Sequence, residues 1–124
     1  MQGIRLSTVT LGTPAPVSLA RFYARLLGWE LGPIEDDTWV AVHNPAGGVG
    51  IACQLEKTHV RPVGPHKPGD QQMQVHLELQ VDDLQTGLRH ALQSGARMAP
   101  YQPQADVRVC LDPAGHPFCL WIAT

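Results

Sequence analysis

Residues 73–95, MQVHLELQVDDLQTGLRHALQSG, determine the fold because their apolar periodicity changes from two to about 3.6. Alternation up to Val81 predicts a strand over residues 73–81, with His76, Glu78 and Gln80 on one face. Asp82-Asp83 then predicts a helix N-cap, and residues 84–93 have helical spacing before a glycine. The segment therefore predicts a strand that leads directly into a helix.

The elements on either side repeat this unit. After the helix, residues 97–101, 107–111 and 118–123 are three predicted strands, the last two joined by the turn Asp112-Pro113-Ala114-Gly115. Upstream, we predict a strand over residues 4–11, a helix over 17–27, and strands over 29–34, 38–43 and 49–55. Repetition of a whole supersecondary unit is a strong signal. We expect a single domain of residues 1–124, with βαβββ modules over 3–55 and 73–124 and a proline-containing connector over 56–72.

The bulk composition excludes several classes of protein. Of the 124 residues, 44% are hydrophobic and 16% charged, which is typical of a globular domain and not of a disordered chain. A formal net charge of -2 with no basic block argues against nucleic acid or an anionic membrane as partner. Cys53, Cys110 and Cys119 form no CxxC pair, so we expect thiols in a reducing compartment. The first residues lack the pattern of a signal peptide, and a cytoplasmic location is the expectation.

Three stretches carry a resemblance to a known family. They are LARFYARLLGW at residues 19–29, HLELQVDDL at 76–84 and LDPAGHPFCLW at 111–121. Together they resemble the vicinal oxygen chelate superfamily, the glyoxalase-like and bleomycin-resistance-like proteins. The resemblance implies an α+β fold in which two βαβββ modules form curled mixed sheets around a cavity, with each helix outside.

The resemblance also implies where a metal would bind in this chain. Metal-dependent members take ligands from four strands, which correspond here to Thr8, Ala52 or Gln54, His76 and Cys119. Only His76 is an ordinary ligand for a hard divalent ion, and a Cys119 thiolate would favour zinc over magnesium or manganese. Because the mapped residues are mostly poor metal ligands, we expect a protein without a resident metal or other cofactor. The alternative is an altered divalent-metal site formed by His76, Cys119 and Gln54.

Extending the alternation to the other strands predicts the lining of a pocket. Thr10, His43 and Cys110 are expected to face it beside the residues that we assign to ligand binding. Those ligand-binding residues are Thr8, Trp39, Gln54, Arg108, Cys119 and Trp121. His76 and Glu78 are the candidate catalytic pair, in which Glu78 orients the imidazole or acts as a base. The alternatives are that the tryptophans are core residues and that Arg108 is solvated.

These expectations give three hypotheses about function. The first is a metal-independent small-molecule-binding protein of the glyoxalase-like or bleomycin-resistance-like type. The second is a metal-dependent lyase, isomerase or dioxygenase with an altered metal site, so enzymatic activity stays open. The third is a partner module without ligand chemistry. We also expect a homodimer, because short sheets leave edge strands that need to be covered.

Overall fold

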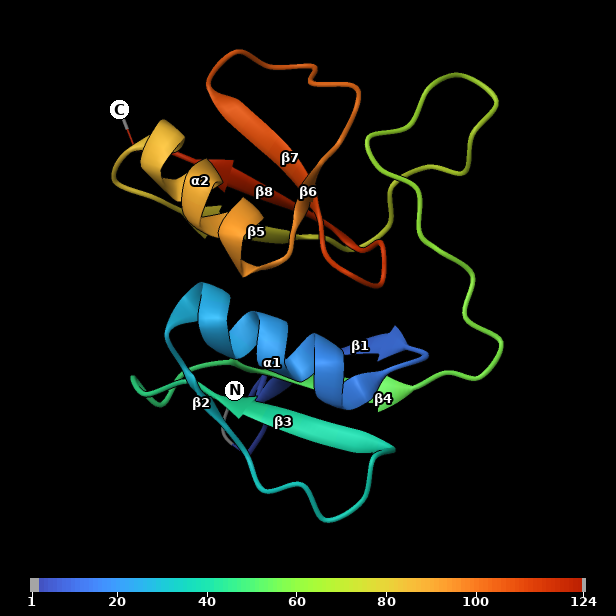
Figure 1. Cartoon of the computed structure of the whole chain (residues 1–124), viewed down its shortest axis with the longest axis vertical. Coiled ribbons are helices and arrows are strands. Elements are labelled where there is room, and N and C mark those ends of the chain that lie inside the picture. Colours follow the sequence, from blue (N-terminus) through green and yellow to red (C-terminus); the bar gives the residue numbers. More distant parts are fainter. Residues whose placement is uncertain (1–2, 124) are drawn as a thin grey trace. The chain divides into compact units, whose positions relative to one another are not determined.

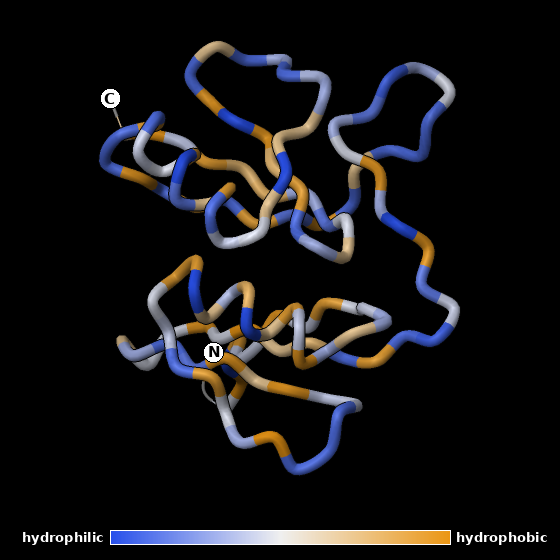
Figure 2. The backbone as a smooth tube through the Cα atoms, in the orientation of Figure 1, coloured by the Kyte–Doolittle hydropathy of each residue, from blue (hydrophilic) through white to orange (hydrophobic). Residues whose placement is uncertain are grey.

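The computed structural model describes residues 3–123, and these divide after His59 into two compact units. Each unit contains one four-stranded mixed sheet and one helix in the order β-α-β-β-β (Figure 1). The predicted α+β fold with two repeated modules is therefore confirmed. The division after His59 lies inside the predicted connector, which Figure 2 shows as mostly hydrophilic.

The first unit is built around a sheet of order β1-β4-β3-β2. Its elements are β1 (Thr8–Thr13), α1 (Pro16–Leu27), β2 (Glu30–Leu31), β3 (Trp39–His43) and β4 (Gly50–Leu55). Strands β1 and β4 are parallel, whereas the other neighbours are antiparallel. Helix α1 begins at a proline, ends at Gly28 with a φ of 68°, and contacts β3 and β4. Because Val40 and Val42 are buried while Trp39 and His43 are exposed, α1 covers one face of the sheet only.

The second unit repeats this arrangement with the order β5-β8-β7-β6. Its elements are β5 (Leu77–Gln80), α2 (Leu84–Ser94), β6 (Arg97–Met98), β7 (Val107–Leu111) and β8 (Pro117–Trp121). The predicted N-cap is confirmed, since the Asp83 carboxylate accepts a hydrogen bond of 2.8 Å from the backbone N–H of Thr86. The α2 helix contacts β8, whose Phe118 and Leu120 are fully buried.

The buried carboxylate of Asp112 shapes the hairpin between β7 and β8. It accepts hydrogen bonds of 2.9 Å from the backbone N–H groups of Ala114 and His116. A buried carboxylate must be hydrogen-bonded in this way to offset the loss of water. The turn thereby sets the register in which β8 returns along β7 and presents Cys119 to β5.

Two predicted strands begin later than expected, and two are shorter. Strand β1 starts at Thr8 instead of residue 4, and β5 starts at Leu77 instead of residue 73. In each case the partner strand limits the pairing: β4 begins only at Gly50, and β8 begins at Pro117, which has no N–H to donate. Val75, expected in the apolar face of the strand, is consequently 82% exposed. β2 and β6 are reduced to two residues each.

Within residues 3–123, no helix is both long and apolar enough to cross a bilayer.

Candidate functional site

The strand register of the second sheet assigns each side chain to one of two faces. Glu78 pairs with Cys119, and Cys119 pairs with Val109 on its other side. Directly opposed residues share a face, so these three side chains form one row across the sheet. Phe118 and Leu120 lie on the other face. We call the first one the His76 face, because His76 lies two positions before Glu78 in the alternation.

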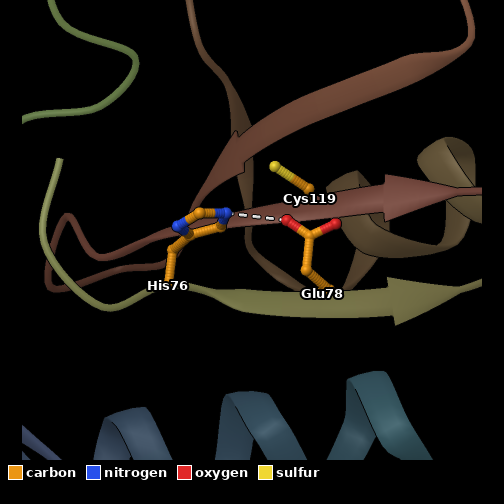
Figure 3. Close-up of side chains that lie close together, drawn as sticks. All are labelled: His76, Glu78 and Cys119. Atoms are coloured by element: carbon orange, nitrogen blue, oxygen red, sulfur yellow. Dashed lines mark hydrogen bonds and ion pairs between the residues drawn. The ribbon is translucent and has the colours of Figure 1, made fainter.

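Three side chains with ionisable groups meet on this face. The Nε2 atom of His76 lies 2.7 Å from Oε2 of Glu78. The sulfur of Cys119 completes a group whose ligand atoms all lie within 4.8 Å of one another. Figure 3 shows His76 and Glu78 rising from β5 and its approach, and Cys119 pointing from β8 toward them. His76 and Glu78 therefore point to one side, as the alternation predicts, and Cys119 lies beside His76 as expected for the predicted pocket. The catalytic role of His76 and Glu78 stays a prediction.

The three groups differ in their access to solvent. The side chains of His76 and Glu78 are 27% and 50% exposed, whereas Cys119 is only 6% exposed. Cys119 packs with Ala99 and Val109, and the partly buried Val107 and Leu111 extend this apolar cluster. The His76 face therefore has an apolar floor and a polar edge along β5, which is the composition of small-molecule sites.

The environment of Cys119 keeps its thiol protonated at neutral pH. Burial raises the pKa of this thiol to about 12, and the hydrogen bond to Glu78, the charge of Glu78 and the nearby Cys110 act in the same direction. Burial alone raises the pKa of Cys110 to about 11. Since the thiolate is the nucleophilic form of cysteine, Cys119 is a poor nucleophile in this state. Its thiol is instead a neutral group next to the Glu78 carboxylate.

Two of the predicted pocket residues lie on the wrong face. Arg108 pairs with Leu120 and Cys110 pairs with Phe118, so both share the face opposite Cys119 and Trp121. The expectation that Arg108 and Cys110 line a pocket together with those residues is therefore wrong. The extrapolated alternation ignored the antiparallel register across the hairpin, in which Val109 and not Cys110 is opposite Cys119. The Arg108 guanidinium donates hydrogen bonds of 2.9 Å to the carbonyl oxygens of Ala105 and Val107.

The remaining predicted residues belong to the first unit. Trp39 pairs with Gln54, and the side chains of Trp39 and His43 emerge on the face away from α1. Thr8 and Thr10 are two residues apart on β1 and therefore share a face. The Thr8 hydroxyl donates a hydrogen bond of 3.3 Å to Ser7. Ala52 is fully buried. The ligand-binding roles of Thr8, Trp39, Gln54, Cys119 and Trp121 stay predictions.

The donor set of the His76 face fits some metals better than others. An imidazole nitrogen, a carboxylate oxygen and a sulfur are ligands typical of zinc, while a thiolate does not suit magnesium or manganese. Glu78 was missed as a donor in the predicted set of His76, Cys119 and Gln54. The spacing of two residues between His76 and Glu78 was a signal in the sequence, but only the β5–β8 register brings Glu78 beside Cys119.

Comparison with known proteins agrees with this architecture. The family model described as glyoxalase-like domain matches residues 8–121. The chain belongs to the glyoxalase-like domain family. This confirms the resemblance to the vicinal oxygen chelate superfamily. No protein in the curated collection matches this member of the family significantly.

Several solved structures share the glyoxalase-like fold. A glyoxalase/bleomycin resistance protein/dioxygenase family enzyme from Burkholderia phytofirmans has 19% identity and a TM-score of 0.70, over 98% of this chain and 100% of that one. A fosfomycin resistance protein from Mesorhizobium loti has 13% identity and a TM-score of 0.64, over 100% and 94%. An antibiotic-binding protein from a Streptomyces species has 14% identity and a TM-score of 0.64, over 100% and 99%. At these identities the similarity shows the fold alone.

Proposed function

We propose that this glyoxalase-like protein binds a small organic molecule on the His76 face without a resident metal. The observation that carries the proposal is the His76–Glu78 pair, 2.7 Å apart, at the edge of an apolar floor formed by Ala99, Val109 and Cys119. An apolar surface with a few convergent polar groups binds and orients a ligand. The His76–Glu78 pair offers hydrogen bonds to a polar group of the ligand, and Trp121 on the same face offers an aromatic surface.

The protonation state of Cys119 supports binding without metal. A thiol whose pKa is raised to about 12 must lose its proton before it can act as a metal ligand, which lowers metal affinity at neutral pH. In addition, the Nε2 atom of His76 is already paired with Glu78. The neutral thiol instead contributes to the apolar floor of the site.

A thermal-shift screen of chelator-treated protein tests this proposal. The panel contains bleomycin, fosfomycin and planar aromatic metabolites, because relatives with this fold include resistance and antibiotic-binding proteins. We expect at least one compound to stabilise the protein, and His76→Ala and Glu78→Gln to reduce its affinity about tenfold. His90→Ala, on the exposed surface of α2, is the matched control and should leave affinity unchanged. Stabilisation seen only after zinc is added would contradict binding without metal.

A zinc site at the same residues is the second candidate, favoured by the three donor atoms within 4.8 Å. When bound there, zinc would supply Lewis-acid chemistry of the kind used by lyases, isomerases and related enzymes. His76, Glu78 and Cys119 would hold it, and Cys119 would first release its proton.

A titration with cobalt(II), monitored by the absorbance of the thiolate-to-metal charge-transfer band, distinguishes the two candidates. Absorbance that Cys119→Ser abolishes and Cys110→Ser retains supports the site. Metal below about a tenth of an ion per chain contradicts it.

We also infer a cytoplasmic homodimer. Cys53, Cys110 and Cys119 are buried thiols, a state that suits a reducing compartment. Strands β1 and β2 are the edges of the first sheet, and β5 and β6 are those of the second, so several edges are available for a second copy to cover. Light scattering should give twice the mass of the 13.5 kDa chain. A mass near that of a single chain would rule the dimer out.

A further inference from the structure

A pocket on the first unit is lined by residues other than those of the His76 face and has a different chemistry. It occupies about 360 Å³ and is lined by Pro33, Glu35, Asp36, Trp39, Ala41 and His43. Its floor is strand β3, on which Trp39, Ala41 and His43 are alternate residues and therefore point to the same side. Because the small side chain of Ala41 lies between them, there is open space between the indole ring of Trp39 and the imidazole ring of His43.

The aromatic wall of this pocket is accessible. Trp39 is 47% exposed at the start of β3, where it pairs with Gln54 of β4, and β2 pairs only with the other end of β3, at Val42 and His43. The strand neighbours of Trp39, Val40 and Val42 on the other face, are completely or almost completely buried. A tryptophan on the exposed face of a sheet leaves much of its apolar surface in water, at a cost that a ligand stacked on the ring would offset.

The chain around the β2–β3 loop is acidic, and two of its carboxylates, those of Glu35 and Asp36, line the pocket with this ring. Residues 30–43 contain Glu30, Glu35, Asp36 and Asp37 but no lysine or arginine. In Figure 2 the stretch of this loop that leads into β3 is hydrophilic. Hydrogen bonds from Thr38 hold the pKa of the Asp36 carboxyl below its ordinary value, so this group is a carboxylate at neutral pH. The pocket therefore combines an indole ring with two carboxylates from the loop.

The loop is held in place next to the strand. The Asp36 carboxylate accepts hydrogen bonds of 2.8 Å and 2.5 Å from the backbone N–H and the hydroxyl of Thr38. The carbonyl oxygen of Thr38 accepts a hydrogen bond of 2.7 Å from Leu55 at the end of β4. At the other end, a Cβ atom at Gly32 would lie 2.9 Å from Ala41 O and 3.1 Å from His43 Nε2. Glycine at this position thus lets the chain pass close beneath the imidazole.

We propose that this pocket binds an organic cation, such as a quaternary or protonated amine, over the indole ring of Trp39. The positive charge would lie against the π face of the ring, and Glu35 and Asp36 would neutralise it from the loop. Trimethylammonium groups suit such a site because their methyl groups contact the ring while the charge interacts with the quadrupole. The proposal does not rest on ligand binding at the His76 face.

NMR titration with choline tests the proposal, with 3,3-dimethylbutan-1-ol as a neutral probe of the same shape. Choline should shift the indole N–H signal of Trp39 and bind at least about fivefold more tightly than the alcohol. Trp39→Leu should lose choline binding, and Glu35→Gln should weaken it about threefold. Asp37→Asn is the matched control, since it removes one charge from the same loop but does not line this pocket. It should change the affinity less than about 1.5-fold.

Three results would overturn the proposal: equal binding of choline and the alcohol, equal weakening by Glu35→Gln and Asp37→Asn, or unchanged binding in Trp39→Leu. Circular dichroism of each variant verifies that it is folded. Because Trp39 is half exposed, Trp39→Phe is a second variant that should fold and retain part of the binding. His76→Ala should leave choline binding unchanged, which separates this result from the test of the His76 face.

Discussion

The two sheets of this protein share one topology but differ in the side chains that they carry on the face away from their helix. In the first sheet, the row that joins β1 to β4 pairs Thr10 with Ala52. In the second, the parallel pair β5 and β8 places Glu78 opposite Cys119, with His76 close by. The first sheet instead has Trp39 beside an acidic loop. A single backbone plan thus supports a histidine, glutamate and cysteine group in one unit and a tryptophan beside an acidic loop in the other, because the chemistry depends on side chains that the plan does not constrain.

The largest expected contrast with an ordinary thiol concerns Cys119. Its pKa of about 12, against an ordinary 9.0, should lower its thiolate fraction, and hence its alkylation rate, about a thousandfold. Glu78→Gln should speed the reaction because the carboxylate contributes to the raised pKa, whereas Glu30→Gln in the first unit should not. Mass spectrometry of iodoacetamide labelling measures both rates. Labelling of Cys119 as fast as that of a cysteine in a flexible peptide would contradict the assignment.

The same pKa shift predicts how stability depends on pH. The folded state binds the thiol proton more tightly than the unfolded state, so its contribution is fully present below about pH 9.0 and is lost as the pH rises toward about 12. We expect the urea midpoint to fall between about pH 8 and about pH 10. The fall should be smaller in Cys119→Ser, and an identical fall in both proteins would assign it to other groups.

The cores of the two units should be similarly sensitive to truncation. Phe22 on α1 and Phe118 on β8 are both completely buried, and the Phe22 ring packs edge-on against Tyr23. Replacing either by alanine should lower the free energy of unfolding by about 3 to 5 kcal/mol. Equilibrium denaturation in urea measures both losses. A loss below about 1 kcal/mol in one variant only would show that its unit contributes little to cooperative unfolding.

The helix N-termini allow a smaller contrast. Asp83 caps α2 through Thr86, whereas the N-cap of α1 is Ala15, whose methyl group accepts no hydrogen bond. Asp83→Ala should cost about 1 kcal/mol of stability, and Ala15→Asp should add about 0.5 kcal/mol. Thermal unfolding of the two variants tests the pair. A destabilising Ala15→Asp would mean that the entry to α1 does not accept a capping carboxylate.

The smallest expected effect concerns the His76–Glu78 pair itself. Both side chains are partly exposed, so the ion pair is screened by solvent. His76→Ala and Glu78→Ala should each change the free energy of unfolding by less than about 0.5 kcal/mol. Urea unfolding of both variants, compared with His90→Ala, checks this. A large loss of stability would indicate a structural role and would weaken the proposal that the pair serves ligand binding.

Local patterns in the sequence were sufficient for the βαβββ repeat. Alternation over 77–80, the cap at Asp83 and the glycines that end the helices depend on neighbouring residues only, and the elements formed in the expected order. Strand ends were less predictable, because pairing stops where the partner strand stops, as at Pro117 beside the start of β5.

The amino-acid sequence by itself therefore determined the order of elements, the module repeat and the side of β5 on which His76 and Glu78 lie. Tertiary structure decided which side chains from different strands meet. Register across the β7–β8 hairpin placed Val109, and not Cys110 or Arg108, beside Cys119, and pairing of β5 with β8 brought Cys119 to Glu78. The physical reason is that side chains alternate with a period of two, so a shift of one residue in a long-range pairing moves every side chain to the opposite face.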